Sequence, residues 1–115
     1  MNMRSVLISV LFLAAAACAP AQRAMVIDPH VAATLAGQKL FEQHCAACHG
    51  ADAAGTRRAP NLRERVQTLD AAFLFGFITN GDLRRGMPSW SRLPDERRWQ
   101  IVTYLKSLEP SRAAR

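Results

Sequence analysis

Two cysteines and a histidine form the most reactive stretch of the sequence. The segment HCAACHG, residues 44–50, places Cys45 and Cys48 three positions apart and His49 directly after them. Thiols at this spacing suit four kinds of chemistry: a disulfide, half of a zinc site, a thiol redox switch, or the covalent attachment of haem. Each of these makes a different demand on the rest of the chain.

Zinc binding and thiol redox chemistry lack the surroundings that they need. A structural zinc site takes four Cys or His ligands, and neither residue type occurs after His49. A thioredoxin-like site belongs to a βαβ unit, whereas the residues before Cys45 have helical periodicity. A plain disulfide fits the spacing but leaves His49 and the long loops of the chain unexplained.

Covalent haem attachment accounts for the whole motif. The two thiols add to the two vinyl groups of haem, and His49 then offers an imidazole nitrogen to the iron. For the second axial position the chain has one methionine beyond the motif, Met87. Its place between Gly86 and Pro88, in an arginine-bearing loop, suits the presentation of a thioether better than core packing. Ligation by histidine and methionine leaves no open position on the iron, which favours electron transfer over catalysis.

Helices and loops of unusual proportion must position these residues. Asp28 and Pro29 favour the start of a first helix that runs to the cysteines, and Thr68 is the expected cap of the second. The second helix is expected over residues 69–79, the third from about residue 94, and the loops over residues 50–67 and 81–93. Helices totalling about 40 residues make a weak core, and loops of this length suggest that they wrap a large apolar cofactor.

The first 21 residues predict an export signal. Met1–Arg4 is a short positive segment, and Val6–Ala17 is an apolar run that as a helix would rise about 18 Å, too little for a hydrocarbon core of roughly 30 Å. Two processing sites fit: cleavage before Cys18, which would lipidate that residue, or ordinary cleavage after Ala21. Because lipidation consumes the third thiol, we expect a periplasmic protein anchored through Cys18, with a free periplasmic protein as the alternative.

Length and charge bound the domain count and the partners. The 115 residues allow one domain, expected over residues 22–110 with a disordered tail at 111–115. The chain has 15 Lys and Arg against 9 Asp and Glu, a net charge of +6. Export excludes nucleic acid as the basic protein's partner, and an acidic protein face fits better. Seven arginines of the two loops point to such a partner: Arg57, Arg58, Arg63, Arg65, Arg84, Arg85 and Arg92.

Four segments of the chain together resemble the class I cytochromes c. They are AGQKLFEQHCAACHG, APNL, GMPSW and DERRWQIVTYLKSL, in this order over about residues 30–109. They are most similar to the short bacterial monohaem type that also forms haem domains of cbb3 oxidases and quinoprotein dehydrogenases. The resemblance implies an all-α cytochrome c fold, with three main helices and two long loops around one covalently bound haem c.

The resemblance also implies a role for each site residue. Cys45 and Cys48 would carry the thioether links, and His49 and Met87 would be the axial ligands of the iron. The backbone carbonyl of Pro60 would accept a hydrogen bond from His49 and fix the orientation of its ring.

Further implied roles concern packing and the haem edge. Gly37 and Phe41 would cross the last helix near Tyr104, with Gly37 allowing close approach. Trp90 and Trp99 fit either the haem surroundings or the core. Arg57 and Arg58 are the candidates for the haem propionates.

The expected function is that of a periplasmic electron carrier of a respiratory chain, not an enzyme. It would pass one electron from a dehydrogenase donor to an oxidase or other acceptor by Fe(II)/Fe(III) cycling. Three rivals are a peroxidase or gas-binding haem protein, a fixed subunit of a larger complex, and a haem-free thiol protein.

Overall fold

The computed structural model describes residues 25–110. The expected export signal, Cys18 and the tail at 111–115 lie outside these residues. Within them the fold is helical and contains no strand, only one isolated bridge between Asp82 and Met87. The elements are α1 (Pro29–His44), α2 (Ala46–His49), α3 (Leu62–Arg65), α4 (Ala71–Asn80), the 3-10 turn η1 (Leu83–Arg85) and α5 (Asp95–Ser107). Three main helices and two long connections are therefore confirmed.

Helix α1 begins where its sequence predicts. The Asp28 carboxylate accepts hydrogen bonds from the backbone N–H groups of His30 and Val31, at 2.8 and 3.2 Å. Pro29 occupies the first turn, where its missing N–H costs nothing. The helix runs to His44, so that Cys45 follows directly at its C-terminal end.

The second helix starts two residues later than predicted, and its cap is Asp70, not Thr68. The Asp70 carboxylate accepts from the N–H of Phe73 at 2.7 Å. The Thr68 hydroxyl is already engaged, because it donates to the Arg65 carbonyl at 3.1 Å, at the end of α3. Two residues able to cap lay within three positions, and local hydrogen bonding to the preceding turn decided between them.

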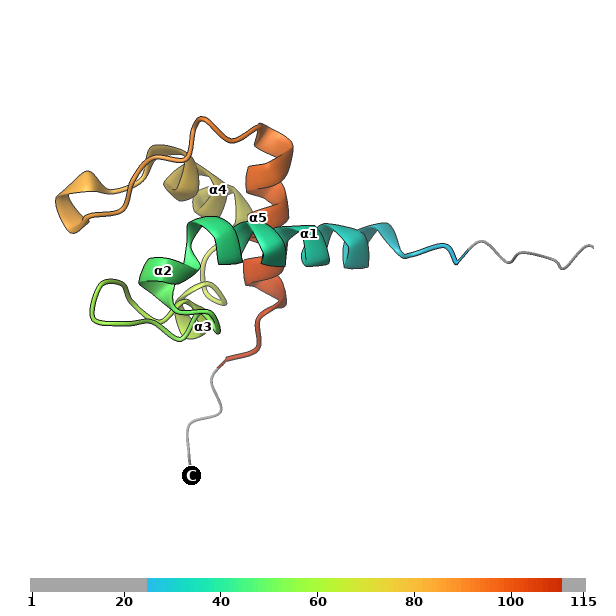
Figure 1. Cartoon of the computed structure of the whole chain (residues 1–115), viewed down its shortest axis with the longest axis horizontal. Helices are drawn as coiled ribbons and strands as arrows, with labels where there is room; N and C mark the ends of the chain where they lie inside the picture. Colours follow the sequence, from blue (N-terminus) through green and yellow to red (C-terminus); the bar gives the residue numbers. More distant parts are fainter. Residues whose placement is uncertain (1–24, 111–115) are drawn as a thin grey trace, which may run out of the picture.

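The core is built on the crossing of α1 and α5, with α4 packed on α5 (Figure 1). Gly37 lies at the crossing: a Cβ there would fall 1.9 Å from the Gln100 carbonyl oxygen. Phe41 is fully buried, and its ring centroid lies 5.4 Å from that of Tyr104. The implied contact of Gly37 and Phe41 with the last helix is therefore confirmed.

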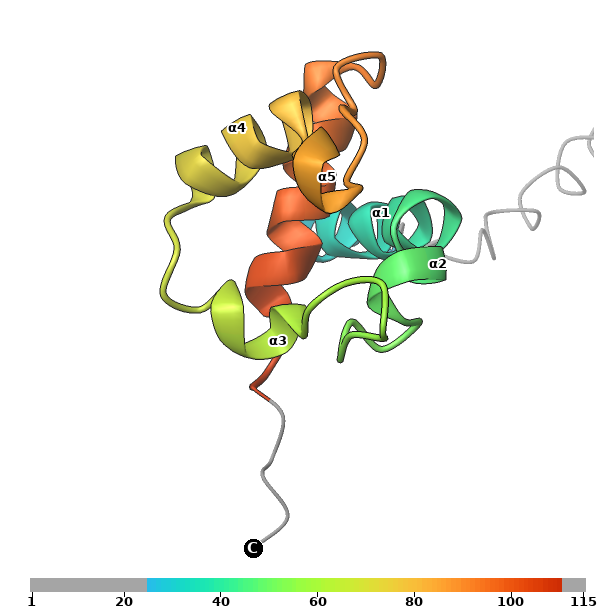
Figure 2. The same ribbon diagram turned by 90° about the vertical axis from the view of Figure 1, so that its left-hand side faces the viewer.

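The loop regions are arranged around this crossing. Figure 2 shows α3 and α4 joined by an open connection on one side of α5, with η1 and its flanking segments beside α4. Two side chains connect the segment between α3 and α4 to the end of α5. Lys106 donates to the Val66 and Leu69 carbonyls at 2.9 Å each, and Gln67 donates to the Leu108 carbonyl at 2.5 Å. Within residues 25–110, no helix combines the length and apolarity of a membrane span.

Candidate functional site

The Cys-x-x-Cys-His motif forms a tight helical turn at the end of α1. Backbone N–H groups of Cys48 and His49 both donate to the Cys45 carbonyl, at 3.1 and 2.9 Å. This turn brings both sulfur-bearing residues and the imidazole to one place in the chain. Both thiols are half-buried and are not bonded to one another.

The surroundings of the two cysteines disfavour the zinc and thiol redox alternatives. Burial, and to a smaller extent the neighbouring Cys48, raise the pKa of the Cys45 thiol to about 12. Thiol exchange requires the thiolate, which such a pKa makes scarce at neutral pH. Among residues 25–110, moreover, no group of three or more His, Cys, Asp or Glu side chains is placed to hold a metal ion.

The loop after α2 folds back on the motif and holds the His49 ring. Nδ1 of His49 lies 3.2 Å from the Pro60 carbonyl oxygen, the contact that the resemblance implies. A carbonyl only accepts, so this hydrogen bond assigns the proton to Nδ1 and leaves the lone pair on Nε2 for a metal ion. Thr56 adds a second tie, because its hydroxyl donates to the Cys48 carbonyl at 2.5 Å.

Gly55 is what allows this loop to close. Its φ is +92°, and a Cβ there would lie 2.6 Å from the Asn61 nitrogen and 2.8 Å from the Pro60 carbonyl carbon. The Gly55 N–H donates to the His49 carbonyl at 2.8 Å. The glycine therefore lies between the histidine and its hydrogen-bond acceptor, where no side chain fits.

Met87 is held in a second loop by backbone bonds. Met87 and Asp82 exchange two N–H to carbonyl hydrogen bonds of 2.9 Å each, which close the loop around η1. Beyond it, Trp90 N–H donates to the Ile78 carbonyl at 3.0 Å and the Ser89 hydroxyl to the Thr79 carbonyl at 2.6 Å. The Met87 side chain is half-buried and packs against the core.

A ring contact that the sequence does not reveal joins the end of α1 to the loop that carries Met87. The sequence favours an exposed His44 at the helix end, but the structure has it half-buried, with its ring centroid 4.9 Å from that of Trp90. Arg92 covers the same indole at 4.6 Å. His44 precedes the cysteine motif and Trp90 follows Met87 by three residues, so this contact places the two candidate ligand segments side by side.

The two tryptophans have different surroundings. Trp90 is buried against His44, whereas Trp99 is 42% exposed and stacks on Phe75 at 4.4 Å, on the α4–α5 contact. Arg57 and Arg58, the candidates for the propionates, are exposed in the loop after α2. The backbone N–H of Arg58 donates to the Thr56 hydroxyl at 3.0 Å, which holds the main chain of this loop while the Arg57 and Arg58 side chains stay at the surface.

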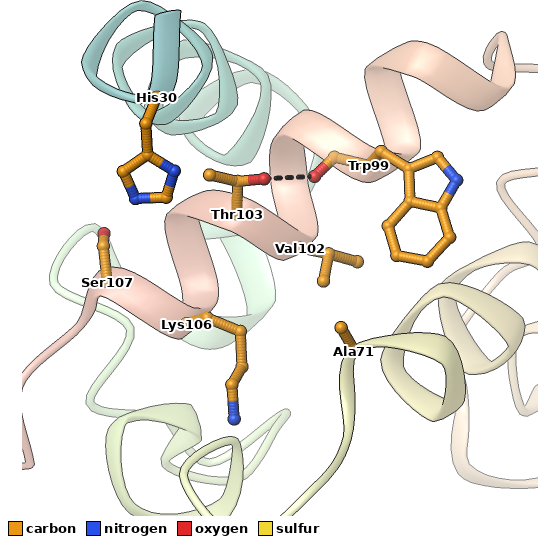
Figure 3. A pocket seen from close by; sticks show the side chains of 7 residues that line it. All are labelled: His30, Ala71, Trp99, Val102, Thr103, Lys106 and Ser107. Carbon is orange, nitrogen blue, oxygen red and sulfur yellow. Dashed lines mark hydrogen bonds between the residues drawn. The ribbon is translucent and has the colours of Figure 1, made fainter. Parts of the chain in front are cut away.

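A separate hollow of about 250 Å³ lies on the outer face of α5 (Figure 3). Its lining comes from the start of α1, the start of α4 and α5: His30, Ala71, Trp99, Val102, Thr103, Lys106 and Ser107. Lys106 there is already occupied with the α3–α4 connection. Neither the two cysteines nor His49, Pro60 or Met87 lines this hollow, so we do not regard it as the functional site.

The side chains brought together fit haem c. Two half-buried thiols at this spacing, an imidazole with a free Nε2 and a thioether on the neighbouring loop are the donor set that covalent haem requires. In Figure 1 the loop after α2 and the loop carrying η1 extend to the same side of the α1–α5 crossing. Zinc, by contrast, finds no fourth ligand.

Sequence comparison finds the same family. Residues 32–105 match the family described as cytochrome C oxidase, cbb3-type, subunit III. The FixP subunit of the cbb3-type oxidase of Bradyrhizobium sp. (strain ORS 278) is 40% identical over 64% of this chain, and the CcoP subunit of Rhodobacter capsulatus is 38% identical over 64%. The chain spans only about a quarter of these relatives, 27% and 28% of their length.

Structural comparison finds the same fold. Cytochrome CL from Methylophaga aminisulfidivorans MPT superposes with a TM-score of 0.60 at 26% identity, over 68% of this chain and 54% of that one. The c-type cytochrome XoxG from Methylobacterium extorquens AM1 gives 0.58 at 22% identity, over 70% and 55%, which shows the fold alone. The c-type cytochromes bind haem c covalently, and Cys45 and Cys48 have the spacing for it. The chain therefore belongs to the cbb3-type oxidase subunit III family and is a class I c-type cytochrome.

Proposed function

We propose that this cytochrome is a one-electron carrier in which Cys45 and Cys48 hold the haem and His49 and Met87 are its axial ligands. The observation that carries the proposal is the contact of His49 Nδ1 with the Pro60 carbonyl at 3.2 Å. It orients the imidazole and fixes its tautomer, as ligand histidines commonly require. The bound haem would supply a one-electron Fe(II)/Fe(III) couple.

Met87 is the better of the two methionines that the structure describes. Met25 is 93% exposed and precedes α1, whereas Met87 is half-buried in a closed loop. Backbone hydrogen bonds between Asp82 and Met87 close the loop and fix where the Met87 backbone lies. With both axial positions filled, no site for substrate remains, and electron transfer is favoured over peroxidase or gas-binding chemistry.

The location and the partners follow from the ends and the surface of the chain. We propose export to the periplasm, with cleavage before Cys18 and a lipid on that residue. The donor would be a dehydrogenase and the acceptor an oxidase, each with an acidic docking face, because seven arginines lie in residues 50–67 and 81–93. The relatives support the oxidase side, because FixP and CcoP are subunits of cbb3-type oxidases.

Absorption spectroscopy of the haem-loaded protein tests the ligand set. Met87→Ala should abolish the absorbance band of the iron–methionine bond and lower the reduction potential, because a thioether stabilises Fe(II). Met25→Ala is the matched control and should change neither. An unchanged band in Met87→Ala, or carbon monoxide binding by the unaltered protein, would contradict the proposal.

Intact mass spectrometry of the protein from membranes and periplasm tests the rest. One mass reports haem attachment and N-terminal processing together. We expect a chain that starts at Cys18 and carries a lipid. A chain that starts at Gln22 would instead show ordinary signal cleavage, with no lipid anchor.

A further inference from the structure

A single leucine projects from the loop that carries Met87. Leu83 is 78% exposed, more than any other large hydrophobic side chain between residues 28 and 110. It belongs to residues 83–86, here termed the tip, which Figure 1 shows at the far end of the loop, away from the α1–α5 crossing. An apolar side chain gains nothing from such a position in the isolated domain.

The tip is held rigidly. The two 2.9 Å bonds between Asp82 and Met87 close its base, and the N–H groups of Arg85 and Gly86 donate to the Asp82 and Leu83 carbonyls at 3.0 and 3.1 Å. Gly86 has φ of +84° and turns the chain back towards Met87. Because Leu83 is presented in a fixed position, little conformational entropy would be lost when it is bound.

Positive charge surrounds this leucine. Arg84 and Arg85 follow it and are both exposed, and only Arg85 is partly offset, by Asp82 at 3.5 Å. One apolar side chain with two guanidinium groups beside it is complementary to an apolar depression with carboxylates at its rim. Burying a central anchor inside a polar rim is how protein interfaces concentrate their affinity.

We propose that the tip is the docking contact for the redox partner protein, with Leu83 entering an apolar pocket edged by carboxylates. The proposal rests on the proposed function, because only Gly86 separates the tip from the proposed ligand Met87. Docking there would bring the partner close to the haem. A lipid surface is the less suitable occupant, since one leucine buries too little apolar area to hold a domain on a bilayer.

Adsorption and electron exchange on coated gold electrodes test the tip with haem-loaded protein. The probes are a carboxylate-terminated monolayer and a mixed carboxylate- and methyl-terminated one. Leu83→Ser should weaken adsorption at least threefold on the mixed monolayer and much less on the carboxylate one. Arg84→Gln combined with Arg85→Gln should weaken adsorption on both, because ion pairing is lost on each.

Matched controls come from the helices, outside the tip. Leu35 on α1 is 51% exposed, and Arg97 is exposed on α5. Leu35→Ser and Arg97→Gln should leave adsorption on both monolayers within a factor of about 1.5. Equal effects of Leu83→Ser and Leu35→Ser would overturn the proposal.

Solution measurements separate this proposal from the ligand assignment. The tip variants should keep the iron–methionine band and the reduction potential of the unaltered protein. A shifted band in Leu83→Ser would mean that the leucine packs on the haem and would overturn docking while leaving electron transfer intact. Binding of anionic phospholipid vesicles that Leu83→Ser abolishes would overturn it in favour of a membrane contact.

Discussion

At the scale of single residues, the site depends on glycines as much as on ligands. Gly55 and Gly86 both have positive φ, +92° and +84°, but their surroundings differ. A Cβ at Gly55 would meet the backbone of Pro60 and Asn61, whereas one at Gly86 would meet nothing within 4 Å. The two positions therefore separate the cost of the backbone conformation from the cost of displacing the loop that holds His49.

We expect Gly55→Ala to destabilise the protein more than Gly86→Ala. Both substitutions pay about 1–2 kcal/mol for a left-handed alanine, and Gly55→Ala adds about 1–3 kcal/mol for the clash. Guanidinium denaturation of the two haem-loaded variants measures the difference. Equal unfolding free energies would show that the loop after α2 accommodates the added methyl group at no free-energy cost.

The cysteine motif and its histidine could be predicted because the residues that define their chemistry are close together in the sequence. The Pro60 contact could be expected only through the family resemblance, since 11 residues separate it from His49. The His44–Trp90 contact escaped prediction altogether. Histidine at a helix end is usually exposed, and nothing local shows that an indole 46 positions away covers this one.

At the scale of elements, the crossing of α1 and α5 and the attachment of α4 carry the fold. Sequence patterns located all three helices, and Asp28 and Pro29 marked the start of α1. They missed the cap Asp70 because Thr68 is an equally good capping residue until the turn of α3 engages it. Cap choice of this kind depends on tertiary neighbours that a local pattern does not contain.

Two helical glycines should respond in opposite directions to alanine. Gly37→Ala places a methyl group 1.9 Å from the Gln100 carbonyl oxygen and should cost about 3 kcal/mol by forcing α1 from α5. Gly76 on α4 has nothing within 4 Å, so Gly76→Ala should stabilise by about 0.5–1 kcal/mol through helix propensity. Thermal or denaturant unfolding measures both, and a neutral Gly37→Ala would contradict the close crossing.

Arg98 connects α5 to both ends of the loop that carries Met87. It is only 6% exposed, donates to the Leu93 carbonyl at 3.1 Å, contacts Thr79 and Asp95, and lies 4.7 Å over the Phe75 ring. Sequence inspection treats it as one of a charged pair, Arg97-Arg98, with no sign of which is buried. Because each nitrogen of this buried guanidinium group has a hydrogen-bond partner, Arg98 holds the segments around it in place.

We expect Arg98→Met to destabilise the protein by about 1–3 kcal/mol, because it leaves the Leu93 carbonyl and the Thr79 hydroxyl without their donor. It should also lower the pH at which the iron–methionine band is lost on alkaline titration, since the Met87 loop is less firmly held. Arg97→Met, on an exposed neighbour, should stay within about 0.5 kcal/mol. Equal behaviour of the two variants would refute a positioning role for Arg98.

At the scale of the whole molecule, the basic character is local. Residues 25–110 contain eleven Lys and Arg and nine Asp and Glu, so much of the net charge of +6 belongs to the chain ends. Steering of an acidic partner must therefore come from the uneven distribution of charge and not from its total. Arginines of the two loops supply that unevenness.

Small redox ions of opposite charge can measure this local potential. Ferricyanide should oxidise the reduced protein with a rate that falls as salt is added, and a tripositive cobalt complex should show the reverse trend. Arg57→Gln combined with Arg58→Gln should reduce the ferricyanide rate about twofold to fivefold at low salt. Arg97→Gln should have a smaller effect, and rates independent of ionic strength would exclude steering.

The α1–α5 crossing also sets an order of events in time. The two helices that make the core are the first and last elements of the described chain, more than 50 residues apart. A chain exported from its N-terminus, as proposed, thus presents the Cys-x-x-Cys-His segment outside the membrane before α5 arrives to enclose it. During that interval both thiols are accessible to the cofactor. The core can form only after the second half of the sequence has followed the motif.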